Sequence, residues 1–136
     1  DEPSAYNPDA PVLDVQDFQA LASHERARAG LLRGLERMLR FYRFEPVFDA
    51  AGRLRVLSAY PRFAERAAHW APVSTHNDLR VTRMLRCLSL CSEHDTARRV
   101  HKAFAHALLA HRGEEAWRTL QHWDAALFAA RCATPG

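Results

Sequence analysis

The stretch that decides the fold is THNDLRVTRMLRCLSLCSEHDTARRVHKAFAHALLAH, residues 75–111. Its apolar side chains recur every three or four positions, which is the spacing of one face of an α-helix. A half-buried strand would instead place them at every second position. The stretch therefore predicts two consecutive helices, over about 75–92 and 92–111, and Gly113 is expected to end the second.

Capping residues indicate where the expected helices begin. Thr75 precedes Asp78 by three positions, and Ser92 precedes Asp95 by the same distance, which is the spacing of a capping box. Asp14 has the character of an N-cap for a further short helix. The other helices are expected over about 14–22, 25–44 (ended by Pro46), 61–72 and 114–132.

Composition favours helices throughout the chain. The 136 residues include 24 Ala, 18 Arg and 16 Leu but only five Gly, a mixture with high helix propensity. Residues 47–60 combine Gly52 with alternating Leu and Arg side chains, so β-structure is expected there and nowhere else. We predict an all-α, single compact domain of about six helices over residues 1–136, with at most one short β-hairpin. Residues 1–13, which hold three prolines, are expected to form an extended strap.

The net charge is modest and comes almost entirely from arginine. There are 18 Arg and one Lys against 16 acidic residues, for a formal net charge of +3 with His neutral. Such a charge is weak evidence for nucleic-acid binding, which would require the arginines of two expected helices to share one surface. These arginines are Arg33, Arg37, Arg40, Arg80, Arg83 and Arg86.

No motif for catalysis, a cofactor or a metal is recognised. The chain has neither a G-x-S-x-G elbow nor a glycine-rich phosphate loop. Cys87, Cys91 and His94 are of types that bind metals, but their spacing matches no common zinc motif, and we expect buried thiols. We therefore predict no catalytic residue, no metal ligand and no cofactor. Three cysteines are too few for a disulfide framework and no apolar run spans a bilayer, so we expect a reduced, cytoplasmic protein.

The best candidate for a binding site lies at the start of the 75–92 helix. His76, Arg80 and Arg83 form a stripe on that helix, separate from its apolar side. The N-terminus of a helix favours anions, and Asn77 adds a further donor in the first turn. We predict a ligand site made of these four residues, flanked by Trp70, for a peptide or an anionic small molecule.

Three alternatives to this ligand site stay open. Arg80 and Arg83 are equally suited to pair with acids such as Glu65 or Asp95 and so to link helices. An enzyme with His76 as general acid or base would use the same pocket for an anionic substrate. An arginine-rich nucleic-acid surface is the third alternative.

The same segment carries a family resemblance. HNDLRVTRMLRCL, residues 76–88, closely resembles the motif H-N-x-L-R-[IV]-T-R-[IL]-L-[KR]-S-L of the opioid growth factor receptor conserved domain. LERMLRFY, residues 35–42, resembles the R-M-L-x-F-Y helix of that family, and the likeness covers about residues 2–110. The sequence departs from the motif at Cys87, where the family has Ser, and the family's W-L-F-P segment is absent from it.

The resemblance implies a helical, receptor-like binding module. Eukaryotic members are described as receptors for an enkephalin peptide that associate with the nuclear envelope without a transmembrane helix. The Ala- and Arg-rich composition looks like that of a bacterial member, for which an opioid ligand is not expected. We therefore predict an interaction module whose partner is an unidentified peptide or anionic small molecule.

Overall fold

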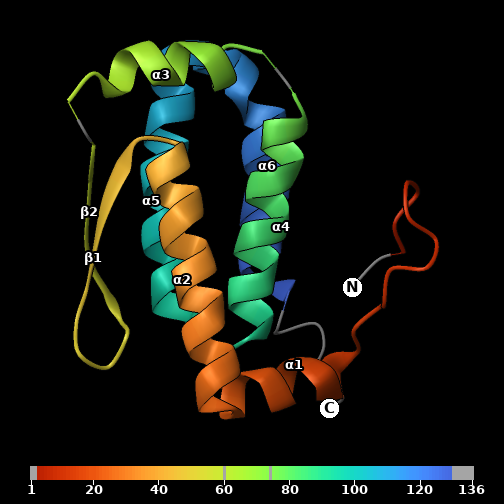
Figure 1. Cartoon of the computed structure of the whole chain (residues 1–136). Helices are drawn as coiled ribbons and strands as arrows, with labels where there is room; N and C mark the ends of the chain where they lie inside the picture. The colour runs from red at the N-terminus through yellow and green to blue at the C-terminus, as the bar shows by residue number, and fades with distance from the viewer. Residues whose placement is uncertain (1–2, 60, 74, 130–136) are drawn as a thin grey trace.

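The computed structural model describes residues 3–59, 61–73 and 75–129 (Figure 1). It is mostly helical, with a small antiparallel sheet. The elements are α1 (Val15–Ser23), α2 (Glu25–Phe41), β1 (Phe44–Phe48), β2 (Leu54–Ala59), α3 (Phe63–Trp70), α4 (His76–Leu90), α5 (His94–Arg112), the 3₁₀ turn η1 (Gly113–Ala116) and α6 (Trp117–Leu127). Figure 1 shows α2, α4, α5 and α6 running along the long dimension, with α3 across one end and α1 at the other. The β1–β2 hairpin lies beside α5 and α2.

The predicted helical character is confirmed, and the differences are local. The 3₁₀ turn η1 precedes α6, so the last α-helix begins at Trp117 rather than near residue 114. The last helix was expected to reach residue 132, and residues 130–132 lie outside the described part of the chain. The sheet begins earlier than expected, at Phe44. That the whole chain forms a single domain stays a prediction.

Pro46 does not end the second helix, contrary to the sequence prediction. Helix α2 already ends at Phe41, and Arg43 turns the chain with a left-handed φ of 67°. Pro46 lies within β1, paired with Leu57 of β2. A proline is tolerated there because a two-stranded sheet has only edge strands, so the missing N–H breaks no interior ladder.

Ser92 ends α4 instead of capping α5. Its φ is 63°, its N–H donates to Ser89 O at 3.1 Å, and Glu93 N donates to Leu88 O at 2.8 Å. These two bonds define a Schellman motif, in which a left-handed residue satisfies the last carbonyls of a helix. The expected capping box of Ser92 and Asp95 is therefore wrong, and α5 begins after Glu93 with no side-chain cap.

The hairpin turn depends on one aspartate and one glycine. Asp49 Oδ1 accepts hydrogen bonds from the backbone N–H groups of Ala51 and Arg53, at 3.0 and 2.9 Å. Gly52 has a φ of 75°, and a Cβ atom there would lie 2.8 Å from Leu32 Cδ1. Glycine is strongly favoured at this position, because other residues adopt this φ only with strain and a Cβ atom would displace the Leu32 side chain.

An aromatic cluster forms the centre of the core. Tyr42, Trp70 and Phe104 pack against one another with ring centroids 5.1–5.4 Å apart. Phe44 and Trp123 extend the cluster to the hairpin and to α6. All five side chains are at most 4% exposed. Burial of such large apolar surfaces is the main term that stabilises this end of the molecule.

The N-terminal segment has no regular structure before α1. Residues 3–14 form neither helix nor strand, and Figure 1 shows this segment extending away from the helices. Asp14 and Asp17 form the capping box that opens α1, which confirms Asp14 as the N-cap. Within the described residues, no helix is both long enough and apolar enough to cross a membrane.

Candidate functional site

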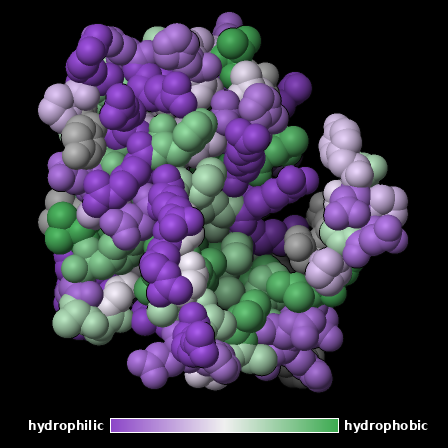
Figure 2. All heavy atoms as spheres, viewed as in Figure 1, coloured by the Kyte–Doolittle hydropathy of each residue, from purple (hydrophilic) through white to green (hydrophobic). Residues whose placement is uncertain are grey.

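An apolar groove lies between α2 and α4. Its volume is about 470 Å³, within the usual range for ligand sites. From α2 it is lined by Leu31, Gly34, Leu35 and Met38, and from α4 by Arg80, Arg83, Met84, Cys87 and Leu88. In Figure 2, apolar atoms are exposed between the hydrophilic side chains of these two helices. The groove thus combines an apolar lining with two cationic side chains.

Gly34 helps to keep the groove open. A Cβ atom at Gly34 would have no heavy atom within 4 Å, so this part of the α2 surface faces open space. Glycine inside a helix costs about 0.5–1 kcal/mol relative to alanine. The sequence therefore carries a destabilising residue where a larger side chain would partly fill the groove.

The cations of the groove, Arg80 and Arg83, have no acidic partner among the described residues. Glu65, which sequence analysis offered as one partner, pairs instead with Arg62, and Asp95 pairs with Arg98. Arg80 makes a long hydrogen bond, from its Nη1 to Asn77 Oδ1 at 3.4 Å. The specific alternative that Arg80 and Arg83 pair with these two acids is therefore wrong.

The structure distributes the predicted site residues over three environments. Arg80 and Arg83 meet at the groove, as the helical spacing predicts. Asn77 is half-buried next to Arg80, and its Oδ1 accepts a hydrogen bond from Tyr42 Oη at 3.0 Å. His76 is exposed and has no polar partner among the described residues. Trp70 is 3% exposed and belongs to the aromatic core, so it does not border the groove.

Tyr42 links this core to the polar end of the groove. Burial raises the pKa of its phenol above the ordinary value, and the nearby Arg80 guanidinium partly opposes that shift. Its hydroxyl therefore stays protonated and donates to Asn77 over a wide pH range. Sequence analysis missed Tyr42 and the α2 side of the groove. The apolar spacing of Leu31, Leu35 and Met38 was visible, but not the helix that they would face.

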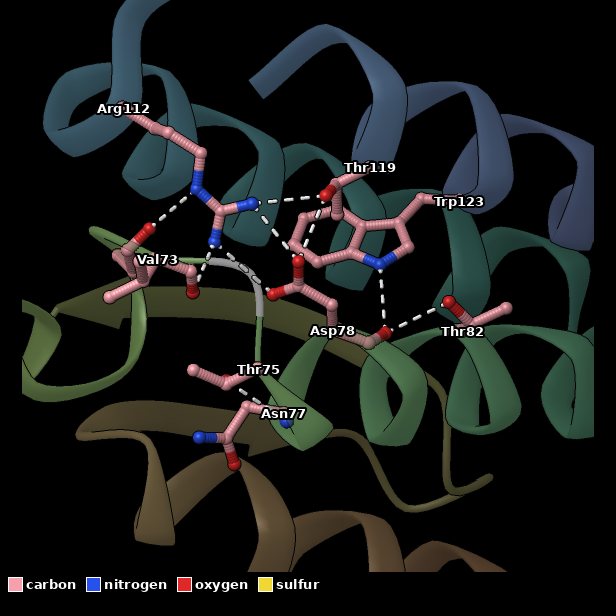
Figure 3. A network of polar contacts seen from close by, with 9 residues as sticks. Val73, Thr75, Asn77, Asp78, Thr82, Arg112, Thr119 and Trp123 are labelled. Atoms are coloured by element: carbon pink, nitrogen blue, oxygen red, sulfur yellow. Dashed lines mark hydrogen bonds and ion pairs between the residues drawn. The ribbon is translucent and has the colours of Figure 1, made fainter. Parts of the chain in front are cut away.

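The start of α4 differs from the predicted anion site. Thr75 is the N-cap, as expected, and its hydroxyl accepts from Asn77 N at 3.2 Å. Asp78 does not complete a capping box, because its carboxylate is buried against Arg112 of α5 (Figure 3). A carboxylate in the first turn already balances the positive end of the helix dipole. The interaction of a bound anion with this helix terminus would therefore be less favourable than the sequence predicts.

Asp78 and Arg112 form a buried ion pair within a larger network (Figure 3). The carboxylate accepts from Arg112 Nη1 at 3.0 Å and Nη2 at 3.3 Å, and from Thr119 Oγ1 at 2.9 Å. The guanidinium also donates to the carbonyls of Ala71 and Val73, both at 2.9 Å. Every side-chain charge in the network therefore has a partner, and its role is to link α4, α5, α6 and the chain before α4.

The Asp78 backbone carbonyl extends this network to α6. It accepts from Trp123 Nε1 at 3.1 Å and from Thr82 Oγ1 at 2.8 Å. The aspartate of the HNDLR segment is thus structural, while the two arginines that follow it face the groove. No local sequence pattern indicates this network, because Asp78 and Arg112 are 34 positions apart.

The two cysteines of α4 lie in different environments. Cys91 is buried at the end of the helix, as expected, but Cys87 is only partly buried and lines the groove. A hydrogen bond from the Cys91 thiol holds the pKa of Cys87 below its ordinary value, and the same bond with burial raises the pKa of Cys91. The expectation of two buried thiols is therefore wrong for Cys87.

Nothing in the described part of the chain adds support to the other chemical hypotheses. No three His, Cys, Asp or Glu side chains gather there as a metal site would require. Of the six arginines considered for nucleic-acid binding, only Arg80 and Arg83 line the groove, and Arg40 pairs with Glu36 on the exposed side of α2. The enzyme and nucleic-acid hypotheses stay untested predictions.

A family model described as the opioid growth factor receptor (OGFr) conserved region matches residues 2–132. No curated protein and no solved structure matches the chain.

Proposed function

The chain belongs to the opioid growth factor receptor conserved-region family, and from that premise we propose that it is a peptide-binding module whose site is the groove between α2 and α4. The ligand is an amphipathic segment with apolar side chains on one face and carboxylates beside them. The observation that carries the proposal is an apolar groove bordered by two arginines without acidic partners among the described residues.

The apolar lining determines how such a ligand binds. The apolar surface of the groove is formed by side chains, so the groove offers no backbone edge for strand addition. These side chains are Leu31, Leu35 and Met38 of α2 and Met84 and Leu88 of α4. A groove between two helices is suited to a third amphipathic helix, whose anchors recur at i, i+3, i+4 and i+7. Methionines at two positions favour adaptable packing against different apolar anchors.

The two arginines determine the charge of the ligand. Arg80 and Arg83 are one turn apart, so both can contact a single carboxylate or two carboxylates on neighbouring turns. Hydrogen bonds to charged groups contribute about 1.5–3 kcal/mol when they form. The proposed ligand is therefore anionic, as the sequence predicts, but it binds one to two turns into α4 instead of at the start of the helix.

The test is a binding titration with defined peptides. The probe is a fluorescently labelled, 14-residue peptide with Leu at the i, i+3, i+4 and i+7 spacing, Glu at three positions beside them and Ala or Gln elsewhere to favour a helix, measured by fluorescence anisotropy. A peptide of the same composition with the Leu spacing scrambled tests the need for an apolar face. A third peptide with Lys in place of Glu tests the charge preference.

Two variants of the groove, each with a matched control, test whether the peptide binds there. Gly34→Leu fills the open part of the groove and should weaken binding at least tenfold, whereas Gly30→Leu places the same side chain on the same helix outside the groove. Arg80→Gln with Arg83→Gln should weaken binding by about 10- to 100-fold while the melting temperature stays within about 2 °C of the parent.

Charge effects at a distance have their own control. Arg98→Gln with Arg99→Gln removes the same net charge outside the groove and should leave peptide affinity nearly unchanged. Equal binding of the Glu and Lys peptides, or unchanged binding in Gly34→Leu, would overturn the proposal. Dodecanoic acid, an apolar chain with one carboxylate, serves as a small-molecule probe. If it binds and none of the peptides does, the proposal is overturned in favour of a small-molecule site.

A further inference from the structure

A second site is built on the polar side of the molecule. We propose that the cleft between the β1–β2 hairpin, the start of α2 and the first turn of α5 binds a compact anion with two or more phosphate groups. The cleft has a volume of about 520 Å³ and, unlike the groove, a mostly polar lining. The inference rests on other residues than the proposed peptide site and does not depend on it.

Positive charge is concentrated in this cleft. Five arginines line it, against the carboxylates of Glu93 and Asp95 in the lining and of Asp49 beside it, which leaves an excess of two positive charges. The arginines are Arg28, Arg53, Arg55, Arg98 and Arg99. A phosphate monoester carries about −1.5 to −2 charges at pH 7, so one such group balances the excess, and the remaining guanidinium N–H groups offer donors to a second. Arginine is also the side chain best suited to phosphate, because its planar fork binds two oxygens at once.

The local ion pairs do not use up this charge. Asp49 lies beside the cleft and accepts from both Arg53 Nε and Arg55 Nε, at 3.0 and 2.8 Å, so one carboxylate serves two cations. Glu93 pairs with Arg28, and Asp95 pairs with Arg98 in an exposed contact. Within the described residues, Arg99 donates to a backbone carbonyl, that of Arg55, at 3.2 Å and pairs with no carboxylate.

The first turn of α5 contributes uncharged donors. The helix has 19 residues and no side-chain cap, since the Glu93 carboxylate is directed to Arg28. The first intrahelical bond of this helix is from Ala97 N to Glu93 O, so the N–H groups of residues 94–96 precede the hydrogen-bonded ladder. Those three residues all line the cleft. Asp95 opposes an anion at this terminus, and its pairing with Arg98 reduces that effect.

Thr96 is the independent observation that favours a ligand. It is 3% exposed and lines the cleft, yet its hydroxyl has no hydrogen-bond partner among the described residues. An anion bound at the first turn of α5 would accept a hydrogen bond from this hydroxyl, beside the backbone N–H groups that bind phosphates at other helix N-termini.

The test is isothermal titration calorimetry of the full chain with sodium tripolyphosphate at low ionic strength. One-to-one binding is expected, with affinity falling as salt increases. Thr96→Val removes the hydroxyl at nearly constant shape and should weaken binding about three- to tenfold. Because that hydroxyl has no protein partner, the variant should melt no lower than the parent. Arg98→Gln with Arg99→Gln should weaken binding by tenfold or more.

The control has the same net charge as the arginine variant. Arg80→Gln with Arg83→Gln changes the other groove and should leave tripolyphosphate affinity within about twofold. A second arm measures sedimentation with phosphatidylcholine vesicles, with and without phosphatidylinositol bisphosphate. Tripolyphosphate binding indicates a free phosphate compound, and binding to the phosphoinositide vesicles alone indicates a lipid headgroup; both support the proposal. Binding of neither probe, binding of single-stranded RNA alone, or equal losses in the two arginine variants would overturn it.

Discussion

Replacing Arg112 with methionine tests whether the network around Asp78 holds the helices together. The substitution keeps a long side chain but removes its charge, so the Asp78 carboxylate, in a residue only 7% exposed, is left without its counter-ion. Breaking a buried pair from one side costs about 3–5 kcal/mol. The carbonyls of Ala71 and Val73 also lose a donor. Val73 is exposed, so water can replace part of that loss.

The expected change is large enough to measure by thermal unfolding. For a 136-residue chain, 3–5 kcal/mol corresponds to a decrease in melting temperature of roughly 10–17 °C. Circular dichroism at 222 nm would follow the transition, and urea titration would give the free energy of unfolding. Arg118→Met, an exposed arginine of α6, is the matched control and should change stability by no more than about 0.5 kcal/mol.

A double variant separates the loss of an ion pair from the loss of packing. Asp78→Leu with Arg112→Met replaces both charges by apolar groups, so no carboxylate is left unpaired. We expect this double variant to be more stable than Arg112→Met alone, because an apolar pair of similar volume often replaces a buried ion pair without loss. The reasoning is refuted if Arg112→Met costs less than about 1 kcal/mol, or if the double variant is as unstable as the sum of the two single ones.

Three further predictions concern individual ionisable groups. Cys87 should react with 5,5′-dithiobis(2-nitrobenzoic acid) faster than Cys91 at neutral pH. Cys91→Ala should shift the pH dependence of the Cys87 reaction rate to higher pH, because it removes the hydrogen bond that stabilises the Cys87 thiolate. The backbone N–H of Arg53, aided by side-chain bonds from Arg55 and Arg53, lowers the pKa of Asp49 from 3.8 to about 2. The stability that Asp49 contributes should therefore be present above about pH 4 and be lost between about pH 4 and 2. Acid titration of the folded fraction would measure this loss, and Asp49→Asn should abolish it. Tyr42→Phe should cost about 1 kcal/mol in urea unfolding, since it removes the donor to Asn77, and an unchanged midpoint would contradict that bond.

Local sequence patterns were sufficient for most of the helices and for one arginine pair. The apolar spacing predicts α4 and α5 to within a few residues, and Asp14 caps α1 as expected. Arg80 and Arg83 share a surface because residues three apart face the same side of a helix. Where these patterns failed, at Pro46 and at Ser92, one residue with positive φ had turned the chain: Arg43 in the first case and Ser92 itself in the second. Such conformations are rare for non-glycine residues, so a sequence seldom predicts them.

The tertiary structure decided what the side chains of those helices do. The sequence alone determines that Asp78, Arg80 and Trp70 lie in or next to helices, but not which of them becomes buried. Packing of α5 and α6 against α4 brings Arg112 and Thr119 to Asp78 and so makes that carboxylate structural. The position of α2 beside α4 makes Arg80 the border of a groove. Helix periodicity comes from contacts over three or four residues. Burial and ion pairing depend instead on contacts between segments more than 30 positions apart, as for Asp78 and Arg112. Local sequence order does not specify those contacts by itself.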